Sequence, residues 1–205
     1  MAIKPILFNT EMVRAILDGR KTCTRRLPRK QIEEKYIEYD EWVQAVAVPG
    51  CTYLREKEFY TQYPPYQPGD LMYVRETFIQ VAAHTFWYKA DDNSWILEGL
   101  HWKPSIHMPK EAARIWMKVT DVHVERLQDI TEDGAKAEGA NWKNGKNVGW
   151  EEKMKRTATE RFAEIWNSTI KKSDLDRYGW DANPYVFVIE FSKIDKPEEA
   201  EHERK

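Results

Sequence analysis

The sequence is poor in residues that build disulfide frameworks and metal centres. It has only two cysteines, Cys23 and Cys51, in 205 residues, and they are not in C-x-x-C spacing. Its five histidines form neither H-x-x-x-H nor H-E-x-x-H, the spacings that place two metal ligands on one face of a helix. We therefore expect two reduced thiols, no structural zinc or other metal, and no cofactor.

Long apolar runs are missing as well. No stretch approaches the roughly 20 apolar residues that a membrane-spanning helix needs, and the N-terminal run reaches Asn9 too early for a secretory signal. We therefore expect a cytoplasmic protein with no membrane partner. The sequence leaves the oligomeric state open.

Aromatic and charged residues, in contrast, are abundant. The composition is 41% hydrophobic and 32% charged with nine Trp and ten Tyr, which is typical of a folded chain. A net charge of -2 argues against a general nucleic-acid binder, yet residues 14–30 hold seven cations and one acid, Asp18. This basic segment suits phosphate or another anion, and a solvated charged surface explains it equally well.

Capping and turn residues predict short helices. Asn9 or Thr10 can cap a helix that ends before Gly19. The same reasoning predicts a short helix from Asp129 or Thr131 to Glu138 before Gly139. A short helix is also predicted near Gln31–Tyr39, and another over Thr157–Ile170, where Phe162, Ile165 and Trp166 share one face that should be core.

Short strands account for much of the remaining pattern. They are predicted over Leu71–Arg75 after the turn Pro68-Gly69-Asp70, over Ile115–Val124, over Pro184–Phe191, and in a hairpin of Phe86–Tyr88 with Trp95–Leu97. Because no regular βαβ alternation is present, we predict an α+β fold, a small mixed β-barrel with peripheral helices, rather than a doubly wound sheet. It forms one domain over residues 1–194, followed by a charged tail at 195–205.

The basic segment contains candidate chemistry. It lacks the second, upstream glycine of a phosphate-binding loop, which disfavours a nucleotide triphosphatase. What remains is a donor, Lys21, a possible nucleophile, Thr24, and an anion clamp, Arg26. Threonine needs a base to act as a nucleophile, and a desolvated lysine can supply one. Ordinary surface positions are the alternative interpretation of Lys21 and Thr24.

The pattern Gly19-x-Lys21-x-x-Thr24-x-Arg26 after a capped helix resembles the hallmark motif of the ASCH domain, whose fold is a PUA-like β-barrel. The resemblance continues in order along the chain. The similar segments are the turn Pro68–Leu71, the long strand Ile115–Val124, the acidic helix region Leu127–Glu138 and the closing strand Tyr185–Phe191. Insertions near 27–67, 77–114 and 140–156 would then lengthen the domain, as in phage-type ASCH proteins.

A bacterial branch of that family hydrolyses the amide of N4-acetylcytidine. By resemblance, Lys21 would activate Thr24, Thr24 would accept the acyl group, and Glu138 would protonate the departing amine. Arg26 and Gly19 would contribute to substrate binding. A small nucleoside is then the expected partner.

Two other functions stay open from the sequence. The chain could be an RNA-binding module that meets phosphates through residues 14–30. Least favoured is a ribonuclease in which Lys21 and Arg26 stabilise a phosphorane-like charge, because no histidine pair lies nearby. Arg25 and Glu76 are secondary site candidates, and an ion pair with an arginine is the alternative for Glu76.

Overall fold

The computed structural model describes six ranges of the chain: residues 1–28, 37–39, 44–48, 51–91, 101–140 and 156–197. The chain divides into two compact units, each described here by itself. The first comprises Met1–Thr22, Pro68–Thr120 and Glu190–Lys205, and the second comprises Cys23–Gln67 and Asp121–Ile189. The single domain over residues 1–194 stays a prediction.

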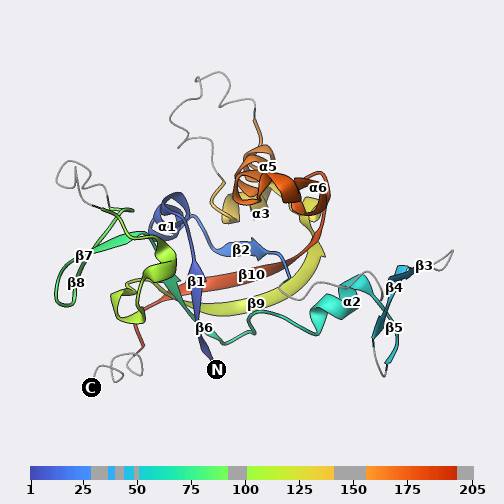
Figure 1. Cartoon of the computed structure of the whole chain (residues 1–205), viewed down its shortest axis with the longest axis horizontal. Helices are drawn as coiled ribbons and strands as arrows, with labels where there is room; N and C mark the ends of the chain where they lie inside the picture. Colours follow the sequence, from blue (N-terminus) through green and yellow to red (C-terminus); the bar gives the residue numbers. More distant parts are fainter. Residues whose placement is uncertain (29–36, 40–43, 49–50, 92–100, 141–155, 198–205) are drawn as a thin grey trace. The chain divides into compact units, whose positions relative to one another are not determined.

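The largest sheet is mixed and has five strands in the order β1-β6-β9-β10-β2 (Figure 1). Strand β1 is parallel to β6, and β6 is antiparallel to β9. The bounds are Ile3–Leu7 for β1, Cys23–Arg26 for β2, Leu71–Arg75 for β6, Trp116–Arg126 for β9 and Tyr185–Ile194 for β10. Mixed α+β architecture is therefore confirmed, whereas no closed barrel is found among the described strands.

Two smaller sheets complete the strands. Ile37–Tyr39 (β3), Gln44–Val48 (β4) and Cys51–Arg55 (β5) form an antiparallel set, and Phe78–Ala82 (β7) pairs with Thr85–Tyr88 (β8). The helix predicted over Gln31–Tyr39 is wrong at Ile37–Tyr39, because these residues pair with Val46–Gln44. Its earlier part lies outside the described residues.

Helix α1, Thr10–Leu17, belongs to the first unit. It begins where the Asn9 side chain accepts a hydrogen bond from the Met12 amide at 2.9 Å. It ends before Gly19, whose φ of +71° is a conformation that favours glycine. The helix and both of its predicted end signals are confirmed.

One buried cluster of the first unit lies around the β7–β8 hairpin. Phe78 faces Tyr88 across the hairpin, and Gln80 faces Phe86. The predicted pairing of Phe86–Tyr88 with Trp95–Leu97 is therefore wrong, since β7 occupies the partner position; Trp95–Leu97 itself lies outside the described residues. The buried cluster comprises Phe78, Met108, Ala112, Ala113 and Trp116, with Tyr73, Phe86 and Tyr88 packed against it.

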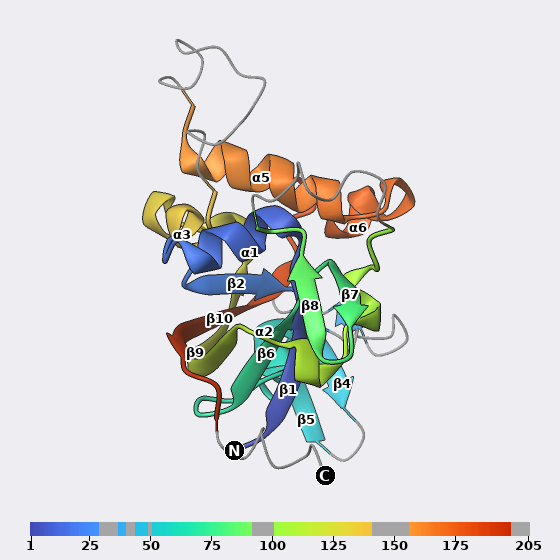
Figure 2. The same cartoon turned by 90° about the vertical axis from the view of Figure 1, so that its left-hand side faces the viewer.

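The second unit is built around two helices that lie side by side, α3 and α5 (Figures 1 and 2). Thr131 caps α3, Glu132–Ala137, by accepting from the Gly134 amide, and Gly139 at φ +86° follows the C-cap residue, Glu138. Helix α5, Ala158–Thr169, starts with a capping box between Thr157 and Glu160. Their shared core comprises Leu127, Ile130, Ala135, Ala140, Ala158, Phe162, Trp166 and Val186.

Several short helical segments remain. These are α2 (Glu56–Thr61), α6 (Leu175–Tyr178) and the 3₁₀ turns Ser105–His107, Lys110–Ala112, Leu127–Asp129 and Lys172–Asp174. Within the described ranges, none of the helices combines the length and apolar character needed to cross a bilayer.

Candidate functional site

Strand β2 and the residues before it carry the polar motif. Lys21 and Thr24 are each only 2% exposed, so neither is a solvated surface residue. In the first unit, the Lys21 Nζ lies 5.4 Å from the centre of the Phe8 ring. In the second unit, Thr24 and Arg26 share one face of β2, because successive side chains of a strand point to opposite faces. The Lys21 and Thr24 side chains are thus each enclosed by protein.

Glu138 reaches the same strand from the end of α3. Its Oε1 accepts a hydrogen bond of 2.5 Å from the main-chain amide of Arg25, the residue that follows Thr24. The Arg25 Nη1 lies 3.5 Å from the same oxygen. Helix α3 sets this position, because Gly139 ends the helix directly after Glu138. Glu138, predicted from the family resemblance alone, therefore lies against β2 in the second unit.

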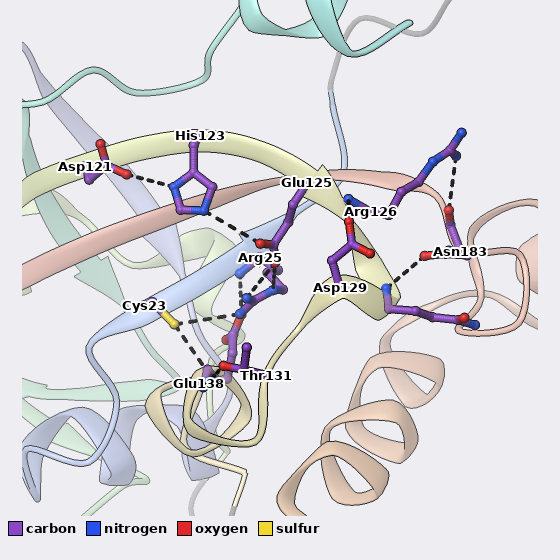
Figure 3. Close-up of polar contacts among 12 residues, drawn as sticks. Cys23, Arg25, Asp121, His123, Glu125, Arg126, Asp129, Thr131, Glu138 and Asn183 are labelled. Carbon is purple, nitrogen blue, oxygen red and sulfur yellow. Dashed lines mark hydrogen bonds and ion pairs between the residues drawn. The ribbon is translucent and has the colours of Figure 1, made fainter. Parts of the chain in front are cut away.

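Arg25 is the centre of a buried charge cluster that joins β2 to Glu125 and Glu138 (Figure 3). Its Nε and Nη2 donate to Glu125 Oε1 on β9 at 2.8 and 2.6 Å. Burial lowers the pKa of the Arg25 guanidinium, but the charges of Glu138 and Glu125 outweigh burial and the net pKa is raised. Arg25 is therefore charged beside these two carboxylates.

Arg26 is half-buried and lies on the Thr24 face of β2. Burial lowers the pKa of its guanidinium, and the electrostatic effects of Glu138 and of the Tyr66 phenol oppose burial without reversing it. A guanidinium beside Glu138 can donate hydrogen bonds to an oxygen-rich ligand. Gly19, in contrast, contributes a left-handed backbone turn, and nothing lies within 4 Å of where a side chain would begin.

Two residues of this cluster were missed in the sequence, Glu125 and His123. They alternate along β9 with the buried Val124, and the His123 Nε2 lies 3.7 Å from Glu125 Oε2. On its other side the His123 Nδ1 lies 2.7 Å from Asp121 Oδ2 (Figure 3). The alternation is visible in the sequence, but it does not indicate which arginine Glu125 contacts. Strand β10 separates β9 from β2 in the sheet order, and only the fold supplies that order.

Comparisons with protein families, curated proteins and solved structures found no match to this chain. Among the residues that the structure describes, no group of three or more His, Cys, Asp or Glu side chains is arranged to hold a metal ion. What the second unit offers is a buried hydroxyl, a buried carboxylate and two arginines.

Glu76, the secondary acidic candidate, lies in the first unit and is paired in full. Arg114 donates to both of its oxygens, at 2.9 and 3.1 Å, and also to Asp91 at 2.7 Å. Burial raises the pKa of Glu76, and Arg114 offsets part of that effect. The ion-pair interpretation of Glu76 is therefore confirmed.

The basic segment at residues 14–30 is less exposed than its sequence indicates. The Arg14 Nε donates to the Ala90 carbonyl at 2.9 Å, and Arg20 pairs with Asp18 at 2.8 Å. Lys21 and Arg25 are buried, and Arg29 and Lys30 lie outside the described residues. The described cations of this segment thus serve internal contacts to a large extent.

Proposed function

We propose that this chain is an amidohydrolase of the ASCH type, with a PUA-like barrel, that cleaves the acyl group from N4-acylated cytosine nucleosides. The observation that supports it is the burial of the motif. Only six polar or charged side chains are buried among the described residues, and four of them belong to the motif segment or meet it: Lys21, Thr24, Arg25 and Glu138. Burying such groups costs free energy, which favours a role beyond solubility.

The residue types fit amide cleavage in two steps. Lys21, once deprotonated, accepts the Thr24 hydroxyl proton, and the Thr24 Oγ attacks the acyl carbonyl carbon. Glu138 donates a proton to the exocyclic nitrogen as the C–N bond breaks, which releases cytidine and leaves an ester on Thr24. Water then hydrolyses that ester, releasing the carboxylic acid and restoring the threonine.

Hydrolysis of N4-acetylcytidine by the purified chain tests this directly. We expect turnover that falls at least 100-fold in Lys21→Ala, Thr24→Val and Glu138→Gln, the usual size of a lost acid, base or nucleophile. Thr22→Val and Lys136→Ala are matched controls, because Thr22 and Lys136 are exposed. Absence of turnover in the wild type, or full turnover in Lys21→Ala, contradicts the proposal.

RNA binding is the alternative function, and it can be tested on the same purified protein. An RNA-binding module predicts affinity for a single-stranded RNA that falls steeply with salt, because phosphate contacts release counterions. Such binding without any hydrolysis of N4-acetylcytidine would favour that alternative over catalysis.

A further inference from the structure

Phe8 and Lys21 meet inside the first unit. Each residue is only 2% exposed, and the Lys21 Nζ lies over the Phe8 ring, 5.4 Å from its centre. A cation within about 6 Å of a ring centre is attracted to the negative face of the ring, and the attraction is stronger where water is excluded. The Lys21 amine therefore lies over an aromatic face for which almost no solvent competes.

Both partners of this contact are anchored by their surroundings. Phe8 directly follows β1, and its main-chain amide donates to the Arg75 carbonyl of β6 at 3.2 Å. The Lys21 main-chain amide donates to the Ala15 carbonyl of α1 at 3.0 Å. The Phe191 ring packs against the Phe8 ring, with 6.5 Å between the two ring centres. The ring and the amine thus come from separate segments of the first unit that are each held in place.

A lysine side chain has many rotamers, so a lysine that acts as a base needs a contact that holds its amine in place. The same lysine gains a positive charge when it accepts a proton, and the face of an aromatic ring stabilises such a charge. We propose that Phe8 is a positioning residue for Lys21: its ring holds the amine and stabilises the charge that Lys21 acquires when it accepts the Thr24 hydroxyl proton. The catalytic part of this inference rests on the proposed function, whereas the contact does not.

Fluorination of the Phe8 ring separates this role from packing, because fluorine withdraws negative charge from the ring face with little change in ring size. The test places phenylalanine with one, two or three ring fluorines at position 8 of the full-length chain. We expect kcat for N4-acetylcytidine to fall with each fluorine, to about one-tenth with three. KM should stay nearly constant, since the contact strengthens as Lys21 becomes charged. Phe8→Leu should lower kcat at least as far, and if it fails to fold the fluorinated series decides alone.

The matched control is the same fluorinated series at Phe78. This residue is also 2% exposed and lies in the first unit, but it packs against Phe86 in the buried cluster around the β7–β8 hairpin. We expect kcat per folded molecule to stay unchanged in that series. If kcat does not vary with fluorination of Phe8, or falls as far with fluorination of Phe78, the inference is overturned.

A second measurement needs no turnover. Urea unfolding of the position-8 series is compared in the wild type and in Lys21→Met, which keeps an unbranched apolar side chain but lacks the amine. Three fluorines should raise the unfolding equilibrium constant about three- to tenfold more in the wild type than in Lys21→Met. Equal effects in both backgrounds overturn the inference, because fluorine would then act through packing alone. An inactive wild type with unequal effects would contradict the proposed function and leave Phe8 as a positioning residue for Lys21.

Discussion

The two units each contain an arginine between two carboxylates, and the two clusters differ in how that arginine is shared. In the Arg114 cluster, Glu76, Arg114 and Asp91, the arginine donates to both oxygens of the deeply buried Glu76. In the Arg25 cluster, Glu125, Arg25 and Glu138, the close donors go to the outer carboxylate. The arginine therefore directs its close donors to the buried carboxylate in the first cluster and to the outer carboxylate in the second.

This difference separates a structural ion pair from a candidate catalytic acid. The Arg114 guanidinium carbon also lies 4.0 Å from the centre of the Tyr88 ring. Arg114 therefore contributes both packing and charge balance. The Glu138 carboxylate instead accepts a hydrogen bond from a main-chain amide of β2, the strand that bears Thr24. Burial alone does not identify a functional acid; how its charge is compensated is more informative.

The largest expected difference between the two clusters appears when one carboxylate charge is removed from each. We expect Glu138→Gln to lower kcat for N4-acetylcytidine by about 10²–10⁴, the range for a lost general acid. Glu76→Gln should leave kcat per folded molecule unchanged, because Glu76 serves Arg114. Steady-state kinetics corrected for the folded fraction measures both, and equal losses in the two variants would refute the distinction.

Stability should respond in the opposite order. Arg114→Met leaves the buried Glu76 charge without its main partner, so we expect the free energy of unfolding to fall by about 3 kcal/mol. The Arg114 side chain is 27% exposed, which keeps this value at the lower end of the range. Combining it with Glu76→Gln should restore part of the loss, and urea unfolding of the single and double variants measures that coupling. Additive losses would contradict a direct pair.

The Arg114 cluster also predicts a pH dependence. Burial raises the pKa of Glu76 despite Arg114, so the folded state binds this proton more tightly than the unfolded chain does. Its contribution to stability is therefore greatest below about pH 4, near the ordinary glutamate value, and is lost as the pH rises through the raised pKa. The stability of the wild type relative to Glu76→Gln should fall between pH 4 and pH 7 in thermal unfolding. A rise in this relative stability would contradict burial as the dominant effect on the pKa of Glu76.

The sequence predicted the local elements better than their pairing. Caps and glycines located α1 and α3, because these signals act within a few residues of the helix ends they specify, and the apolar face of Phe162, Ile165 and Trp166 located α5. The partner of Phe86–Tyr88 was wrong, since β7 and β8 turn at His84, a non-glycine residue at φ 58° that carries little turn signal. Local helix signals can therefore be recognised in the sequence, whereas the pairing of strands depends on the assembled core.

The candidate site followed the same rule. Lys21, Thr24 and Glu138 were predicted by motif resemblance, and their burial could not be read from a charged segment. Glu125 was not predicted, because its contact with Arg25 joins residues 100 positions apart on strands that are not neighbours in the sheet.

A third carboxylate, that of Glu132 at the start of α3, is exposed and can be compared with the two buried ones. Like Glu138 it accepts from main-chain amides, here those of Ala158 and Thr159 at 2.7 and 3.2 Å, and the Ala158 hydrogen bond lowers its pKa. That stability is present above the ordinary glutamate pKa and is lost as the pH falls through the lowered one. We expect Glu132→Gln to cost about 1 kcal/mol of the free energy of unfolding at neutral pH, as for a lost cap, and less below about pH 4. Asp133→Asn, one residue away and exposed, is the control in urea unfolding; an equal loss there would attribute the effect to charge near the helix and not to the amides.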